Sequence, residues 1–224
     1  MKRPTVEVVR ETGWDRAYAA ALRTQGKDSQ GKVPSEKWEV RSLMAEHSQI
    51  KLVEYRISYK DLRQWVGVHL LRHPFVLPFI HSQRVDRDEE RIKQAVDKVM
   101  QVISEDLKSD PDFNLRDFRF QGETNDQDFY VNAQSLINIS RKRLCSCASE
   151  ETRYAWQIVK DAIAEFDPMM AHCMVRQCIY RGFCPEMRPA CKYADTAMFR
   201  EELKKYRSVC KSQETNNNNH IKKL

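Results

Sequence analysis

The sequence is poor in glycine, with six in 224 residues, and it has no Gly-rich loop of the kind that cradles phosphate groups. No apolar run approaches the ~20 residues that cross a bilayer. The first residues, MKRPTVEVVRETGW, lack the apolar core of an export signal. No Ser/His/Asp or Cys/His set of the kind used in nucleophilic catalysis stands out. These absences argue against a membrane-spanning, secreted or P-loop protein, and we expect a cytoplasmic one.

The composition allows a sizeable hydrophobic core. Hydrophobic residues make up 41% of the chain and charged residues 31%, which suits one domain or two small ones. The net charge of +6 is spread along the sequence, so it fits a nucleic acid or a small phosphate ester equally well. Without an export signal, the cysteines are expected to be thiols or metal ligands rather than disulfides. They are Cys145, Cys147, Cys173, Cys178, Cys184, Cys191 and Cys210.

Hydrophobic periodicity predicts a chain made mainly of helices. The helical segments are 14–25, 34–47 with Ser35 as its cap, 60–73, 86–109, 128–145, 149–166 and 196–210. The stretch KLVEYRISY at 51–59 alternates apolar and polar residues and predicts a strand, while Pro74 and Pro78 prevent a regular helix between 74 and 78. The pattern indicates a helix-rich α+β fold. We expect one domain over 1–210 and a disordered polar tail over 211–224.

Arginines beside an apolar run suggest an anion site. The candidates are Arg72, Arg84, Arg116 and Arg143, because a guanidinium holds phosphate or a planar carbonyl through a fixed fork of donors. Arg72 and Arg84 flank the run FVLPFI at 75–80, and a charge there must find a partner or leave the core. Ser82 could complete a phosphate cradle. The structural alternative is a buried segment with its charges at the ends.

Two groups of residues raise the question of a metal. His69 and His73 are spaced i, i+4, but neither has a clear acidic neighbour, and His47 and His81 are the other candidates. The spacing C-x4-C-x5-C-x6-C from Cys173 to Cys191 is wider than the usual zinc knuckle. Buried thiols are the preferred interpretation, and we expect no metal.

One predicted helix carries polar residues that could serve a ligand. Asn132 and Arg143 are eleven residues apart, which places them within ~20° of one helical face. Asn138 lies on another side of that helix. The alternative for these residues is N-capping or simple exposure.

Together these segments resemble the flavin-dependent thymidylate synthases. The family signature, R-H-R-x-x-S-x-N-E-x-S-x-R, corresponds to RHPFVLPFIHSQR at 72–84. Upstream, LMAEHSQI at 43–50 looks like the family helix that ends in a flavin-contacting histidine, here His47. Downstream, residues 131–159 are similar to N-A-R-S-L-x-N-F-x-x-x-R…A-Q-W-E-I-R, and GFCPEMRPAC at 182–191 resembles the ending of one branch. The resemblance runs from about residue 38 to 192. Matching residues are Arg72, His73, Ser82, Arg84, Asn132, Asn138, Arg143, Glu151 and Arg153.

The departures from the family pattern fall mainly where flavin and substrate meet. In the signature, Pro74 replaces arginine, Leu77 serine, Phe79 asparagine and Ile80 glutamate. Elsewhere, Gln134 stands where arginine is usual and His69 where glutamine is usual. The surviving positions are mainly those that the family uses on the nucleotide.

The resemblance implies a twisted, mainly antiparallel sheet flanked by helices, and it implies site residues. Arg143 would face the pyrimidine ring and Arg72 would lie between ring and flavin, so both are catalytic candidates. Nucleotide contacts are implied for Ser82, Gln83, Arg84, Arg116, Arg143 and His69. Flavin contacts are implied for His47, Gln49, Arg72, His73, Asn132, Gln134 and Asn138.

The resemblance also implies an activity, a methyltransferase-type transfer of one carbon to C5 of dUMP. It implies FAD as cofactor, methylenetetrahydrofolate and NADPH as co-substrates, and a homotetramer that binds a pyrimidine deoxynucleotide monophosphate and no nucleic acid. The altered signature leaves two alternatives: hydroxymethyl transfer to dUMP or dCMP, or a non-catalytic nucleotide-binding protein that has lost flavin.

Overall fold

The computed structural model describes residues 3–82, 89–113, 121–187 and 191–211. Its centre is a four-stranded antiparallel sheet in the order β1-β2-β4-β3. The strands are β1 (Thr5–Arg10), β2 (Glu54–Arg63), β3 (Val76–Ile80) and β4 (Thr124–Asn132). The expected α+β class with an antiparallel sheet is therefore confirmed.

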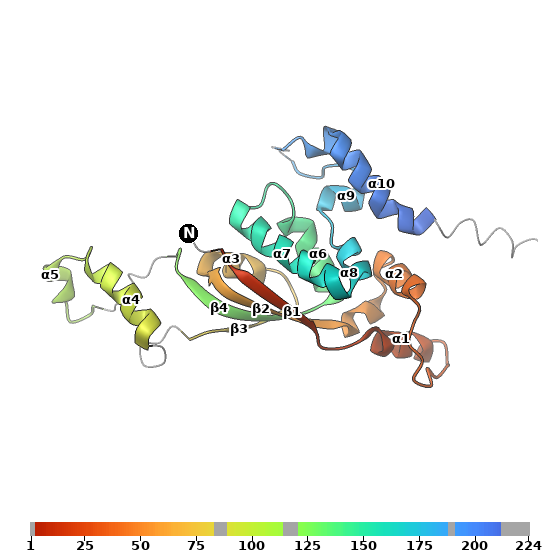
Figure 1. Ribbon diagram of the computed structural model, residues 1–224, viewed down its shortest axis with the longest axis horizontal. Coiled ribbons are helices and arrows are strands. Elements are labelled where there is room, and N and C mark those ends of the chain that lie inside the picture. The colour runs from red at the N-terminus through yellow and green to blue at the C-terminus, as the bar shows by residue number, and fades with distance from the viewer. Residues whose placement is uncertain (1–2, 83–88, 114–120, 188–190, 212–224) are drawn as a thin grey trace, which may run out of the picture.

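Helices lie on one face of this sheet. Figure 1 shows α6, α7 and α8 against that face, α9 and α10 further out, and α4 and α5 set apart at one end. The helices are α1 (Trp14–Arg23), α2 (Glu36–Met44), α3 (Gln64–Leu71), α4 (Glu89–Met100), α5 (Glu105–Lys108), α6 (Ala133–Arg143), α7 (Glu150–Phe166), α8 (Pro168–Cys173), α9 (Gln177–Arg181) and α10 (Ala197–Lys211). Two 3-10 helices, η1 (Ser48–Leu52) and η3 (Tyr193–Asp195), complete the described elements.

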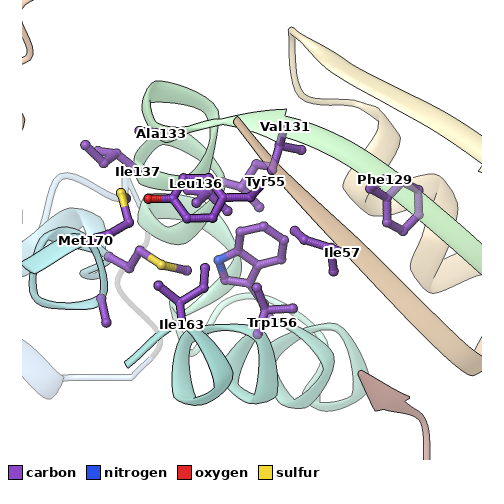
Figure 2. Close-up of a cluster of buried hydrophobic side chains, with 14 of the residues drawn as sticks. Tyr55, Ile57, Phe129, Val131, Ala133, Leu136, Ile137, Trp156, Ile163 and Met170 are labelled. Carbon is purple, nitrogen blue, oxygen red and sulfur yellow. The ribbon is translucent and has the colours of Figure 1, made fainter. Parts of the chain in front are cut away.

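The core lies between the sheet and helices α6 to α8, and it is built from large side chains (Figure 2). Trp156 of α7 and Tyr59 of β2 are almost fully buried, and burying a large apolar side chain stabilises the fold by ~2–3 kcal/mol. The polar atom of each ring finds a partner: Trp156 Nε1 donates to Ser140 Oγ at 2.9 Å, and the Tyr59 hydroxyl donates to the Ala155 carbonyl at 2.7 Å. The rings therefore fix α6 and α7 relative to each other and to the sheet.

Asp167, between α7 and α8, joins the first strands to the helical layer. It is only 3% exposed, and its Oδ2 accepts hydrogen bonds from Arg10, Trp14 Nε1 and the Tyr55 hydroxyl at 3.0, 3.0 and 2.7 Å. Its Oδ1 accepts from the backbone N–H of Met170 and caps α8. A buried carboxylate is tolerated here because both oxygens are satisfied and Arg10 is its counter-ion.

The prediction of a helix from residue 128 is wrong in its first part. Residues 124–132 form β4 between β2 and β3, with Phe129 and Val131 buried on the helical side of the sheet. The helix begins only at Ala133, where the Asn132 side chain accepts a hydrogen bond from Ser135 N at 2.9 Å. Tertiary pairing on both edges overrides the local helical spacing here.

Three other elements differ from the sequence prediction. The single helix predicted over 86–109 is two helices in its described part, α4 and α5, separated by residues 101–104. Residues 60–63 extend β2, so α3 begins at Gln64 rather than at residue 60. The proline-bearing segment forms β3, an edge strand in which Pro78 is paired in register with Phe129. Proline fits an edge strand because its missing N–H leaves no interior ladder bond unmade. The other helices predicted between residues 14 and 47 and after residue 149 are confirmed within a few residues.

Candidate functional site

Arg143, the last residue of α6, reaches the carboxyl end of α3. Its Nε donates to His73 Nε2 at 3.0 Å, and one terminal nitrogen donates to the His69 carbonyl at 2.6 Å. That carbonyl belongs to the last turn of α3, whose acceptors have no partner within the helix. The guanidinium therefore closes α3 and holds the turn that follows it.

Neighbouring cations change the ionisation of this group of residues, which we term the Arg143 cluster: His69, Arg72, His73 and Arg143. Burial, followed by the charges of Arg143 and Arg72, lowers the pKa of His73 to about 4. The same causes lower the pKa of His69. At neutral pH the His73 imidazole is thus uncharged and can accept the Arg143 hydrogen bond.

The two guanidiniums of the cluster have no acidic partner in the part of the chain that the structure describes. No carboxylate there forms an ion pair with Arg72 or Arg143. Burial, and then the charge of Arg72, lowers the pKa of Arg143. Two cations that repel each other beside neutral imidazoles favour an anion or an electron-rich carbonyl between them.

The cluster is braced from α7 and from the start of α6. His69 Nδ1 lies 3.1 Å from the hydroxyl oxygen of buried Thr152, which accepts in turn from Ser149, the cap of α7, at 2.8 Å. Ser135 Oγ donates to the carbonyls of Pro74 and Phe75 at 3.3 and 3.4 Å. Phe75 itself has φ of +61°, a conformation that costs a non-glycine residue ~1 kcal/mol or more. Sequence reasoning missed Thr152 and Ser149, which lie outside the quoted motif letters, and also Ser135, although it matches the serine of the family pattern N-A-R-S-L.

A second polar group gathers around the acidic residue before His47, and we term it the Glu46 cluster. Gln134 Nε2 donates to Glu46 Oε2 at 2.6 Å, and Arg141 pairs with Oε1. Asn138 Oδ1 accepts from Arg141 at 3.3 Å, and the Arg141 guanidinium lies 3.6 Å from the centre of the Tyr180 ring. Burial would raise the pKa of Glu46, but hydrogen bonds from Arg141 and Gln134 outweigh it and lower the pKa.

The residues expected to contact flavin thus fall into separate places. Gln134 and Asn138 belong to the Glu46 cluster, and exposed His47 follows directly in the chain. Gln49 donates to Ser42 Oγ at 3.5 Å. Asn132 caps α6, so it stands at the opposite end of that helix from Arg143, ~16 Å away at 1.5 Å per residue. The shared face predicted for Asn132 and Arg143 does not bring them together.

Of the residues expected on the phosphate, Ser82 lies in the described part of the chain. Ser82 lies beyond β3, whereas Arg72 precedes it. At ~3.3 Å per residue, the extended chain from Phe75 to Ser82 spans about 20 Å. Gln83, Arg84 and Arg116 lie outside the described residues.

The apolar run of the altered signature is exposed rather than buried. Phe75 is 74% exposed, and Leu77 and Phe79 are each 58% exposed. Leu77, Phe79 and Tyr130 border an open hollow of about 660 Å³, which Asn132 also lines. The Phe79 and Tyr130 rings meet edge to face, with centroids 5.6 Å apart. The alternative of a buried run with charges at its ends is therefore wrong, and the strand edge presents an apolar surface that needs a cover.

The cysteines and histidines do not form a metal cage in the described part of the chain. No three His, Cys, Asp or Glu side chains there gather in a way that could hold a metal ion. Cys173 is buried and donates to Met44 Sδ at 3.7 Å, while burial raises the pKa of Cys178 to about 11. In the same described ranges, no helix has the length and apolarity to cross a bilayer.

Comparison with known proteins defines the fold class but no closer relationship. No protein-family model matches the chain, and no curated protein matches it in sequence. The chain shares its fold with a solved structure of a flavin-dependent thymidylate synthase. A matching structure is thymidylate synthase X (ThyX) from Helicobacter pylori, solved with FAD and dUMP, at a TM-score of 0.53 and 16% identity over 76% of this chain and 99% of that one. At that identity the likeness establishes the fold alone.

Proposed function

We propose that this protein binds a pyrimidine deoxynucleotide monophosphate and catalyses flavin- and folate-dependent one-carbon transfer to C5. Thymidylate synthesis from dUMP is the default reaction. The supporting observation is the convergence of Arg72 and Arg143 beside neutral His73 in a chain with the ThyX fold.

Arg143 is the proposed ring-binding residue because its orientation is already fixed. Two of its nitrogens are held by His73 and the His69 carbonyl, so little reorganisation is needed when a substrate carbonyl arrives. A guanidinium held in this way would polarise the ring carbonyl and stabilise the negative charge that develops as C5 becomes a nucleophile. Arg72 would add a second positive charge on the flavin side.

The phosphate contacts would come from Ser82 and Arg84, and Gln83 and Arg116 would be further nucleotide contacts. Because the extended chain from Phe75 to Ser82 spans about 20 Å, we infer that one chain would not supply both ends of a mononucleotide site. We therefore propose that each site combines segments of two chains within a homotetramer, as the family resemblance implies. The exposed apolar edge at Leu77 and Phe79 would then lie at or near a subunit junction.

The hollow beside β3 fits a flat ring system. Its walls include Phe75, Phe79 and Tyr130, with the polar group of Asn132 at one side. Residues that would hold FAD are His47, Gln49, Asn132, Gln134 and Asn138. Gln134 and Asn138 would have to exchange their present bonds with Glu46 and Arg141. When bound, FAD would supply the hydride, with methylenetetrahydrofolate giving the carbon and NADPH the reducing equivalents.

The apolar edge favours a second candidate on the same scaffold. Leu77, Phe79 and Ile80 stand where the family has polar residues, and all three are exposed, while the ring-facing arginines remain. An enzyme that transfers a hydroxymethyl group to dUMP or dCMP would keep the nucleotide contacts and would differ at the apolar edge formed by Leu77, Phe79 and Ile80. A nucleotide-binding protein without flavin would show the same pattern.

The absorption spectrum of the purified protein separates these candidates. A flavin spectrum, or uptake of added FAD, supports either enzyme, and incubation with dUMP or dCMP, folate and reductant then identifies the product. A colourless protein that takes up no FAD yet binds dUMP would leave only the nucleotide-binding function. Absence of dUMP and dCMP binding would contradict the proposed function altogether.

A further inference from the structure

A second hollow lies among α7, α8 and α10, and its volume is about 370 Å³. Lys160 of α7 lines this hollow. It lies about two helical turns after Thr152, the residue that contacts His69. The apolar wall includes Met169 and Val175. A hollow of this size is within the range that holds small organic ligands.

Lys160 is a partly buried cation without an ion-pair partner among the described residues. Glu202 also lines the hollow, but it forms no ion pair with Lys160 in the described part of the chain, and its Oε2 accepts a hydrogen bond from the Tyr193 hydroxyl. Burial lowers the pKa of Lys160, and although Glu202 and Asp161 raise it, Arg176 and Lys205 lower it further. A desolvated ammonium beside other cations is costly unless an anion joins it.

The opposite wall carries a pair of stacked rings. His172 and Tyr206 have centroids 5.8 Å apart and an interplanar angle of 18°. His172 Nε2 lies 3.1 Å from the Tyr206 carbonyl; a carbonyl only accepts, so Nε2 carries the proton. Burial and the charges of Lys160 and Lys205 lower the pKa of His172. The imidazole is therefore neutral at pH 7, and the positive charge at the hollow comes from the lysines.

We propose that this hollow is a binding site for a small phosphate ester with a flat apolar body. Its phosphate pairs with the ammonium groups of Lys160 and Lys205, and its flat part lies against Met169, Val175 and the Tyr206 ring. The site is separate from the Arg143 cluster, and the proposal does not depend on the proposed nucleotide chemistry.

Pyridoxal 5′-phosphate is a suitable probe because it combines a phosphate, a flat ring and an aldehyde. Lys205 then holds the phosphate while the uncharged form of the Lys160 amine adds to the aldehyde carbon and water leaves, giving an imine. Borohydride delivers a hydride to the imine carbon and solvent supplies the proton. Peptide mass spectrometry identifies the labelled lysine. We expect Lys160 to be labelled at a concentration at least ~10-fold below that for exposed Lys204 and Lys142, since a charge pair in a desolvated site contributes ~1.4 kcal/mol or more.

Three comparisons test the anion contact itself. Inorganic phosphate should protect Lys160, pyridoxal without phosphate should label it ~10-fold less efficiently, and Lys205→Met should weaken the labelling by a similar factor. Lys160→Met should remain folded, because it removes an unpaired charge and keeps the apolar stem, and should bind dUMP as before. Equal labelling of Lys160, Lys204 and Lys142, or labelling that ignores phosphate and Lys205, would overturn the proposal.

Discussion

Arg143 and His73, 70 positions apart in the chain, are joined by a hydrogen bond of 3.0 Å from the guanidinium Nε to the imidazole Nε2. The bond links the end of α6 to the turn after α3 and requires an uncharged His73, which burial and the two neighbouring arginines ensure. The arrangement places a fixed guanidinium where α3, α6 and the start of β3 meet.

Replacing Arg143 with lysine should weaken dUMP binding ~10- to 100-fold, because an ammonium keeps the charge but loses the planar fork of donors. Lysine cannot bond both His73 and the His69 carbonyl in the same way, so the free energy of unfolding should also fall by ~1 kcal/mol. Calorimetric titration with dUMP and urea unfolding measure the two effects. Arg200→Lys, at an exposed position of α10, is the matched control, and equal affinities for the two variants would argue against Arg143 as a nucleotide ligand.

Stability should fall as the pH drops from about 6.5 toward 4. The folded pKa of His73, about 4, is below its usual 6.5, so in this window the unfolded chain binds a proton that the folded chain excludes. His73 therefore contributes fully to the free energy of unfolding above pH 6.5, and this contribution is lost as the pH falls toward 4. The loss should be ~1–2 kcal/mol, once solvent screening of a half-buried group is allowed for. His69 and His172 act in the same direction. Urea unfolding at several pH values should show a shallower slope for His73→Asn; an unchanged slope would contradict the assignment.

Asp167→Ala should be among the most destabilising single substitutions. It leaves Trp14 Nε1 and the Tyr55 hydroxyl without their acceptor in the core, removes the counter-ion of Arg10 and uncaps α8. The expected loss is ~3–5 kcal/mol. Chemical denaturation can be compared with Asp161→Ala on the exposed face of α7, which should cost less than ~0.5 kcal/mol. A similar effect of both substitutions would rule out the proposed role of Asp167.

The exposed edge of β3 should be covered in the assembled protein. Light scattering is expected to give a homotetramer, and the double substitution Leu77→Ser, Phe79→Asn should shift the mass toward smaller species while the circular dichroism spectrum stays unchanged. The reason is that burying each of these two side chains at the interface contributes ~1.5–3 kcal/mol per chain to the free energy of association, and the substitutions remove this contribution. Val33→Ser, at another exposed apolar position, is the control. A monomeric wild-type protein would exclude sites shared between subunits.

Local sequence patterns predicted the helices well where one face meets the core. The Ser35 cap and the spacing of Val40 and Leu43 specify α2, and Ser149 begins α7 as expected. The local patterns failed at residues 128–132. Phe129 and Val131 are compatible with either a strand or one face of a helix, and only the pairing with β2 and β3 makes this segment a strand. They also did not reveal β3, since a strand containing Pro78 is stable only at the edge of an existing sheet.

The candidate site was predicted in part. Motif resemblance selected Arg72, His73 and Arg143, and the structure brings these together. The motif resemblance gave no indication that Glu46 and Arg141 pair, or that Thr152 supports His69. Such contacts form between side chains from distant segments of the sequence. Spacing on a helix likewise placed Asn132 and Arg143 on one face but did not prevent them from lying at opposite ends.

The sequence by itself determined the helix-rich α+β class, the absence of a glycine-rich phosphate loop, and the arginines available to an anion. These properties follow from composition and local periodicity, which any stretch of chain carries with it. Only the tertiary structure decided that the FVLPFI run is an exposed edge strand, that His73 is neutral, and that Lys160 lines a hollow among α7, α8 and α10. Burial and the charges of residues far apart in sequence set these properties, and they exist only once the chain has folded.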